Sequence, residues 1–229
     1  MNQIFKVSCI QNNSGTNISK NISDVTQLVI NAHSDGAEFI CLPEYFCYVD
    51  NDDGRMLVHS YFEEEHPALP HFCILAEKLN AWLLLGSLPI KISNEKVNNR
   101  SYLINNQGKI EAKYNKLHLF DVNLSDGESY LESTTVEAGD KPIIASTPWG
   151  PLGMSICYDL RFAYLYRQLA QNGANFLTIP AAFTKTTGMA HWHTLIRARA
   201  IETGCYVFAP CQCGSHPGER KTYGHSLIV

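Results

Sequence analysis

The stretch GMSICYDLR, residues 153–161, contains the transition that decides the fold. The residues from Leu152 to Ile156 form a short apolar run, which is typical of a buried strand, and a helical pattern follows from about Phe162 to Asn172. Cys157 therefore falls at the carboxyl end of a predicted strand, where the chain turns into a helix. Strands that alternate with helices are typical of layered α/β proteins, and we predict this fold class.

The same strand-and-helix unit recurs on both sides of this stretch. A strand at residues 5–9 precedes an amphipathic helix at 18–33, which Gly36 closes, and a strand at 38–42 follows. The further predicted elements are helices at 70–80 and 191–203, strands at 82–88, 143–146, 176–179, 206–209 and 226–229, and a hairpin of strands 102–104 and 109–114. Residues 119–140 are predicted to be irregular. No linker or repeat divides the chain, so we predict a single domain over residues 1–229.

Composition excludes several classes of function. The chain has 229 residues, of which 45% are hydrophobic, and 18 basic residues face 22 acidic ones for a net charge of −4. Such a chain has neither the basic surface that binds nucleic acid nor an apolar run that could cross a membrane. We also expect no amino-terminal export signal, because the first residues lack a basic region followed by a long apolar stretch. We therefore expect no nucleic-acid partner, no membrane association and a cytoplasmic location.

The cysteines and histidines do not form a metal-binding pattern. Eight cysteines without an export signal are expected to be reduced thiols. Cys211 and Cys213 are separated by one residue and no matching pair follows, which disfavours a zinc site. His191 and His193 would point to different faces of a helix. We expect no metal and no cofactor.

Cys157 is the candidate nucleophile. A thiol at a strand-to-helix turn faces the positive end of the helix, and we expect this position to favour the thiolate. A base is also needed near the sulfur, and histidine is the usual one. A Cys–His hydrolase therefore stays open, with four histidines available: His118, His191, His193 and His225.

Two other ionisable residues occupy predicted strand ends. Glu44 follows the strand that Pro43 terminates, and Lys116 follows the hairpin strand that ends at Tyr114. Ligand sites of layered α/β proteins tend to lie just beyond such carboxyl ends. Glu44 and Lys116 are therefore candidates for the same site as Cys157.

Three segments together resemble the signature motifs of the nitrilase, or carbon-nitrogen hydrolase, superfamily. They are residues 42–44 (LPE), 114–121 (YNKLHLFD) and 157–162 (CYDLRF), in the order that this family uses. The resemblance extends over essentially the whole chain. It implies a four-layer α-β-β-α sandwich, a homodimer or larger homo-oligomer, and a reaction without metal or cofactor.

The resemblance also implies roles for individual residues. Glu44 would be the general base, Cys157 the nucleophile that forms an acyl-enzyme, and Lys116 the group that stabilises the oxyanion together with the backbone N–H of Tyr158. Glu132 matches a second glutamate of the family, which we expect to orient the lysine. The implied substrate is a small-molecule amide.

Residues 212–216, Arg220 and residues 223–226 resemble the deaminated glutathione amidase branch most closely, and the omega-amidase branch second. Both branches imply a 2-oxo dicarboxylic skeleton, so a cation should meet a substrate carboxylate. Arg161, which opens the predicted helix behind Cys157, is one candidate. Phe183 and Thr184, which follow the strand at 176–179, are predicted to line the pocket.

The chain departs from the family pattern at two places. His193 stands where an acidic residue is expected, which would alter a charge near the site. The sequence also ends at Val229, inside a predicted strand, whereas family members are expected to continue, so the C-terminal part of the fold would be missing. These departures leave open an inactive relative that serves as a binding subunit.

Overall fold

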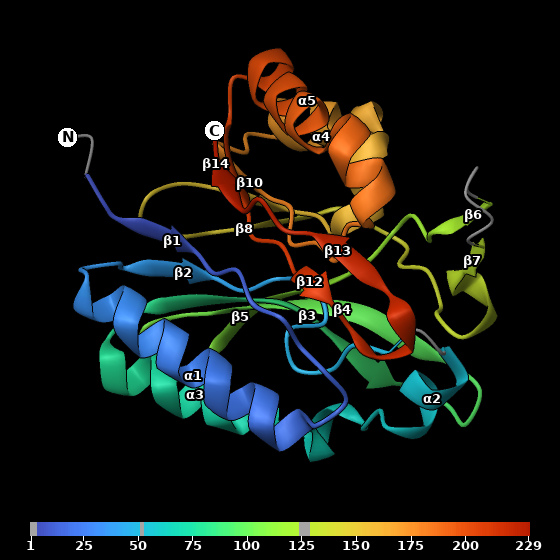
Figure 1. Ribbon diagram of the computed structural model, residues 1–229. Coiled ribbons are helices and arrows are strands. Elements are labelled where there is room, and N and C mark those ends of the chain that lie inside the picture. Colours follow the sequence, from blue (N-terminus) through green and yellow to red (C-terminus); the bar gives the residue numbers. More distant parts are fainter. Residues whose placement is uncertain (1–3, 51–52, 124–128) are drawn as a thin grey trace.

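The computed structural model describes residues 4–50, 53–123 and 129–229. Two five-stranded sheets face each other, and a pair of helices covers the outer side of each sheet (Figure 1). This arrangement confirms the predicted α-β-β-α sandwich. Among the described residues, no helix is both long enough and apolar enough to span a membrane.

The first sheet has the strand order β1-β2-β3-β4-β5 and carries helices α1 and α3. Strands β1, β2 and β3 are parallel, whereas β3, β4 and β5 form an antiparallel meander. The bounds are β1 Val7–Cys9, α1 Ile18–Ser34, β2 Phe39–Cys41, α3 Ala68–Leu79, β3 Trp82–Lys91, β4 Val97–Ile104 and β5 Ile110–Asn115.

The second sheet has the order β14-β11-β10-β9-β8 and carries helices α4 and α5. Its three central strands are parallel, and antiparallel strands flank them on both sides. The bounds are β8 Ile143–Ala145, β9 Leu152–Met154, α4 Ala163–Gln171, β10 Phe176–Thr178, α5 Lys185–Thr203, β11 Tyr206–Ala209 and β14 Leu227–Ile228.

Short elements connect the layers around one end of the sandwich. They are α2 Asp53–Val58, β6 Asp121–Asn123, β7 Ser129–Leu131, β12 Cys213–Ser215 and β13 Lys221–Tyr223, and the 3-10 helices η1 Glu63–Glu65, η2 Glu132–Thr134, η3 Cys157–Arg161 and η4 Pro217–Glu219. Strands β6 and β7 pair with each other, as do β12 and β13. None of these four strands was predicted, because they are mostly polar and lack the apolar run that marked the buried strands.

Helix α1 shows how the local sequence forms the outer layer. Asn17 caps the helix, since its side chain accepts a hydrogen bond of 3.0 Å from the backbone N–H of Lys20. Ile22, Val25 and Val29, spaced three and four residues apart, are buried against the sheet. The predicted helix at 18–33 is thereby confirmed to within one residue.

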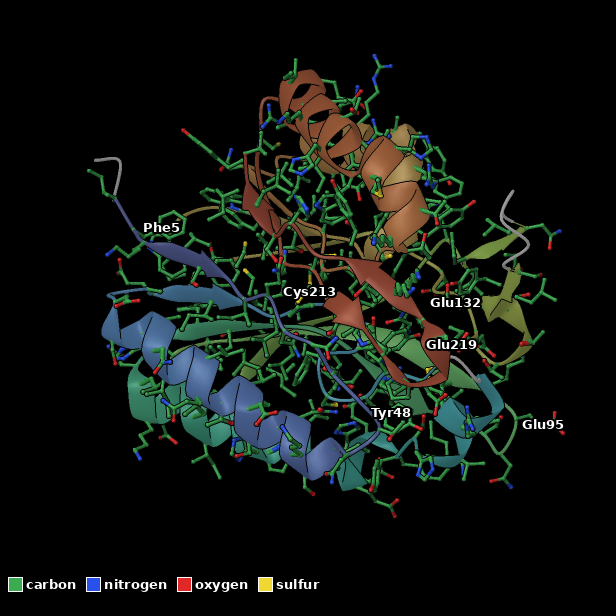
Figure 2. All side chains as sticks on the ribbon, in the orientation of Figure 1. Phe5, Tyr48, Glu95, Glu132, Cys213 and Glu219 are labelled. Atoms are coloured by element: carbon green, nitrogen blue, oxygen red, sulfur yellow. The ribbon has the colours of Figure 1, made fainter. Side chains whose placement is uncertain are left out.

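The apolar interior between the sheets contains side chains from both of them. Leu84 and Leu103 of the first sheet meet Met154 and Leu177 of the second, and all four are fully buried. Phe5, just before β1, lies at the end of the sandwich near the amino terminus (Figure 2), and its ring stacks on Trp149 with centroids 4.4 Å apart. Such burial on two facing sheets provides the dominant stabilisation of the fold.

The structure corrects several predicted elements. Residues 119–140 are not wholly irregular, since they contain β6, η2 and β7. The helix predicted at 191–203 begins six residues earlier, at Lys185, because the hydroxyl of Thr184 caps it. In the C-terminal segment, Val229 exchanges two backbone hydrogen bonds with Val207 of β11, at 2.8 and 3.0 Å.

Candidate active site

Glu44 is held in a turn just beyond the carboxyl end of β2. The backbone N–H of the next residue, Tyr45, donates a hydrogen bond of 3.1 Å to the hydroxyl of Ser87, and Tyr45 itself has a left-handed φ of +53°. Gly86 lets β3 approach this turn, because a Cβ atom there would lie 1.9 Å from the carbonyl oxygen of Leu42. The close approach fixes the direction of the Glu44 side chain.

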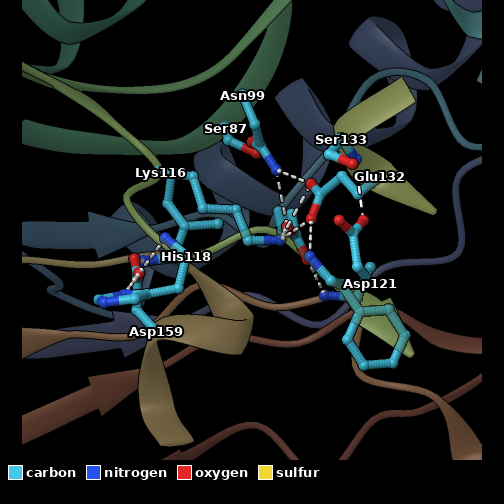
Figure 3. A network of polar contacts seen from close by, with 12 residues as sticks. Ser87, Asn99, Lys116, His118, Asp121, Glu132, Ser133 and Asp159 are labelled. Carbon is cyan, nitrogen blue, oxygen red and sulfur yellow. Dashed lines mark hydrogen bonds and ion pairs between the residues drawn. The ribbon is translucent and has the colours of Figure 1, made fainter. Parts of the chain in front are cut away.

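Lys116 lies between two carboxylates (Figure 3). It follows β5, only 2% of it is exposed, and its Nζ lies 3.1 Å from Oε1 of Glu44 and 2.9 Å from Oε2 of Glu132. Burial alone would lower the pKa of Lys116, but the negative charges of Glu132 and Glu44 outweigh it and raise the pKa above the ordinary value. The ammonium group is therefore kept protonated.

Glu44 has a partner on each side of its carboxylate. Oε1 accepts a hydrogen bond of 2.8 Å from the side-chain amide of Asn99, and Oε2 accepts one of 2.8 Å from the backbone N–H of Ala182. Burial would raise the pKa of Glu44, but the charge of Lys116 and the hydrogen bonds from Cys157, Ala182 and Asn99 lower it overall. Glu44 is therefore ionised, and it lines the same cavity as the Cys157 thiol.

Cys157 is the first residue of η3 and has a left-handed φ of +46°. Its backbone N–H donates a hydrogen bond of 2.9 Å to the carbonyl of Pro180. Burial and the charge of Glu44 raise the pKa of the thiol well above its ordinary value, although Lys116 lowers it. The expectation that the turn favours the thiolate is thus wrong: η3 is a short 3-10 helix, and the adjacent carboxylate keeps the thiol protonated.

Asp159 connects the lysine segment to the cysteine turn. Its fully buried carboxylate accepts hydrogen bonds from the Tyr114 hydroxyl at 2.7 Å and from the backbone N–H groups of Ile156 at 2.8 Å and His118 at 3.0 Å. Figure 3 shows it beside His118. Tyr114 and His118 flank Lys116 in the chain, so Asp159 sets the position of the ammonium relative to Cys157.

Sequence reasoning did not identify Asp159 or Asn99 as part of the site. Asp159 belongs to the CYDLRF motif, but its role as an acceptor for three donors depends on the tertiary fold. Asn99 lies in β4 within a run of four polar residues, 98–101, and this run in a strand whose other residues are apolar or aromatic was an available signal. Its side-chain amide donates to both Glu44 and Glu132, at 2.8 and 3.2 Å.

A cavity of about 650 Å³, including the part open to solvent, adjoins these groups. Glu44, Lys116, Glu132 and Cys157 all reach its wall, so the structure brings together the four predicted catalytic side chains. The other polar and aromatic groups in the wall include Tyr45, Tyr48, Asp50, Phe120, Tyr130, Tyr158, Phe183, Thr184, Thr187 and Arg220. A concave site lined by these polar and aromatic groups suits a small organic substrate.

Of the four predicted pocket residues, Tyr158, Phe183 and Thr184 line the cavity and Arg161 does not. The Arg161 guanidinium packs over the rings of Tyr158 and Phe183, at 5.9 and 5.5 Å from their centroids, and its Nη2 lies 3.3 Å from Nδ1 of His191. A contact between Arg161 and a substrate therefore stays a prediction, and the arginine that lines the wall is Arg220.

The four candidate histidines lie away from the cavity. Within the described parts of the chain, no histidine is among the residues that line it. The ring of His118 stacks on Phe162 with centroids 3.7 Å apart and its Nδ1 contacts Asp159. Nε2 of His193 lies 3.1 Å from Nδ1 of His225, so the His193 ring faces another histidine and not the catalytic groups. The geometry therefore gives the Cys–His alternative no base.

The described residues contain no cluster of three or more histidine, cysteine, aspartate or glutamate side chains that could hold a metal ion. The charged centre instead consists of one ammonium, two carboxylates and one thiol. These groups can transfer a proton, attack a carbonyl and stabilise the negative charge that develops on its oxygen.

The family profile for carbon-nitrogen hydrolases matches residues 6–229. The chain belongs to the carbon-nitrogen hydrolase family. It is 39% identical to the deaminated glutathione amidase of a Synechocystis strain, over 98% of this chain and 84% of that protein. Identity to the deaminated glutathione amidase of Dictyostelium discoideum is 36%, over 100% of this chain and 81% of that protein.

Solved structures agree with the assignment of this chain to the carbon-nitrogen hydrolase family. The NitFhit protein of Caenorhabditis elegans superposes with a TM-score of 0.91 at 37% identity, over 98% of this chain and 55% of that one. Nit3 of Saccharomyces cerevisiae, a member of branch 10 of the nitrilase superfamily, superposes with a TM-score of 0.86 at 28% identity, over 98% and 82% of the two chains. The resemblance recognised in the three motifs is confirmed.

Proposed function

We propose that this chain is an amidase that uses Glu44, Lys116 and Cys157 to hydrolyse a small amide through an acyl-enzyme. The observation that carries the proposal is the convergence of these groups: Glu44, Lys116 and Cys157 line the same cavity, and Oε1 of Glu44 lies 3.1 Å from the Lys116 ammonium. Family membership supports this chemistry, and the cavity beside the sulfur accommodates a substrate.

Acylation begins with proton transfer from the thiol to Glu44. The sulfur attacks the amide carbon, and the carbonyl electron pair moves to the oxygen. Lys116 and the backbone N–H of Tyr158 then stabilise the oxyanion, a contribution of roughly 2.7 to 4 kcal/mol for each well-placed donor. When the intermediate collapses, the carbon–nitrogen bond breaks, Glu44 returns its proton to the leaving nitrogen, and a thioester remains on Cys157.

Deacylation uses the same carboxylate. Glu44 takes a proton from a water molecule, whose oxygen attacks the thioester carbon. The carbon–sulfur bond breaks, the sulfur recovers the proton from Glu44, and the free acid departs. Glu132 takes no proton in this scheme: it accepts hydrogen bonds of 3.0 and 2.9 Å from Lys116 and so orients the ammonium.

The proposed substrate is a deaminated glutathione-like amide. Relatives with this activity in their names are 36 to 39% identical to the chain over nearly its full length. A 2-oxo acid omega-amide is the second candidate, because it presents a similar acyl chain to the same cavity.

A substrate panel tests the proposal. Purified protein is incubated with deaminated glutathione, 2-oxoglutaramate and a simple nitrile, and the acid product is measured by mass spectrometry. We expect hydrolysis of one or both amides, and a loss on the order of 10³-fold or more when Cys157 is replaced by alanine. Cys73→Ala is the matched control, since Cys73 lies in α3 and does not line the cavity. Full turnover by Cys157→Ala would refute the mechanism.

A further inference from the structure

Arg220 brings an unused positive charge into the cavity. It follows η4 at the tip of the β12–β13 hairpin, beside Glu219 (Figure 2), and it lines the cavity wall together with Cys157. The hairpin holds it in place, since the backbone N–H of His216 donates to the Arg220 carbonyl at 2.8 Å. His216 is itself buried, and its Nε2 lies 2.6 Å from the Thr222 hydroxyl.

The guanidinium has few partners within the protein. Its Nη2 donates to the carbonyl of Ala182 at 3.3 Å, and its carbon lies 5.9 Å from the centroid of the Tyr130 ring. Its Nε is buried without a hydrogen-bond partner, and it forms no ion pair within the part of the chain that the structure describes. A buried donor without a partner destabilises the protein, so a ligand that accepts a hydrogen bond from it gains affinity.

The other charged groups in the wall already have partners of opposite charge. Lys116 pairs with Glu44 and Glu132, and Asp50 pairs with Arg55 at 2.9 Å. The catalytic centre therefore holds two carboxylates against one ammonium, which would repel an anionic substrate. Arg220 supplies the charge that offsets this repulsion.

Ala182 connects Arg220 to the reacting groups. Its backbone N–H donates a hydrogen bond to Glu44 and its carbonyl accepts one from Arg220, so the same residue makes both contacts. A substrate amide at Cys157 can thus extend a short chain toward the guanidinium. Guanidinium binds carboxylates through two parallel hydrogen bonds, which fix orientation as well as charge.

We propose that Arg220 binds a carboxylate of the substrate and so selects amides that carry an anionic group away from the reacting carbonyl. The inference rests on the proposed function, because it concerns the same cavity. It assigns to the β12–β13 hairpin a role in substrate selection, separate from the bond-breaking groups.

Two amides of equal chain length test the proposal kinetically. Glutarate monoamide carries the carboxylate, and pentanamide lacks it. Arg220→Gln should raise KM for the monoamide about 10- to 100-fold, the loss expected for charge-assisted hydrogen bonds, and change kcat/KM for pentanamide by less than about twofold. Lys221→Gln is the control, since it removes the same charge from an exposed position of the same hairpin. Equal losses on both amides would show a structural role and overturn the proposal.

A binding measurement separates this proposal from the amidase proposal. Calorimetric titration with glutarate needs no catalysis, and it should show binding to the wild type that weakens about tenfold or more in Arg220→Gln and stays unchanged in Lys221→Gln. Glutarate binding that does not depend on Arg220 would refute carboxylate recognition even if both amides are hydrolysed. Arg220-dependent binding without any hydrolysis would support it and refute the amidase.

Discussion

The ionisation states of Glu44 and Cys157 determine how the sulfur is activated. Glu44 is ionised at rest because Lys116 and three hydrogen bonds lower its pKa against the effect of burial. The thiol is protonated because burial and the adjacent carboxylate raise its pKa. The proton must therefore cross to Glu44 as the sulfur attacks, whereas a Cys–His pair would hold a thiolate before the substrate binds.

This resting state predicts that kcat/KM stays nearly constant over a broad pH range. The pKa of Glu44 lies below its ordinary value of about 4.3, and that of Cys157 lies above its ordinary value of about 8.5. At any pH between these two values, Glu44 is ionised and the Cys157 thiol is protonated, which is the state that the mechanism needs. We expect kcat/KM for a small amide to be constant within about threefold from pH 5 to 8, and to fall at lower pH as Glu44 is protonated. Near-ultraviolet circular dichroism checks that the fold persists. A rise of about tenfold per pH unit between pH 6 and 8 would indicate a required thiolate or histidine base.

At this scale the sequence predicted the catalytic candidates better than the residues around them. Glu44, Lys116 and Cys157 each follow a strand, and strand ends are visible in hydrophobicity. The direction of a side chain is not visible there: Arg161 lies within the nucleophile motif, yet its guanidinium packs on the rings of Tyr158 and Phe183 and does not line the cavity. Arg220 belongs to a hairpin of three-residue strands and reaches the cavity only through tertiary packing.

Among the elements, the contact between β3 and the turn after β2 is the tightest near the site. A Cβ on Gly86 would meet the backbone of Leu42 and Pro43 at 1.9 and 2.3 Å, distances that no side-chain rotation can relieve. The turn that carries Glu44 therefore depends on a glycine in a neighbouring strand.

Replacing Gly86 by alanine should displace Glu44 and reduce turnover by about 100-fold or more, since a misplacement of about 1 Å can cost this much. Overpacking should also destabilise the fold by about 1–3 kcal/mol, measured by chemical denaturation. Gly15→Ala is the matched control, because a Cβ there would have no atom closer than 4.0 Å. Wild-type activity in a folded Gly86→Ala variant would contradict this account of the turn.

Element boundaries were predictable where packing agreed with local preference. Helix α1 has a cap, an apolar stripe and a terminating glycine, and its limits follow from these features. The start of helix α5 was predicted too late because its first turns contain threonines and Gly188, which disfavour a helix in isolation. A Cβ at Gly188 would lie 2.4 Å from the Tyr223 side chain, so this glycine permits close contact with β13.

At the scale of the whole molecule, the site forms where the two sheets meet. Glu44, Asn99 and Lys116 come from the first sheet and its connections, while Cys157 and Ala182 come from those of the second. Hydrophobic periodicity predicted α/β layers but not how the two sheets face each other. That arrangement came from the family resemblance, and the homo-oligomer implied by it stays a prediction.

The central claim is that groups from both sheets act together to acylate Cys157. The most direct test is acid quench of the wild-type protein during turnover of an activated amide, such as a para-nitroanilide, whose good leaving group makes deacylation the slow step. Peptide mass spectrometry should find the acyl group on the peptide that contains Cys157 and none on the peptide that contains Cys73. Steady turnover with Cys157 unmodified, or an acyl group on another residue, would contradict the account.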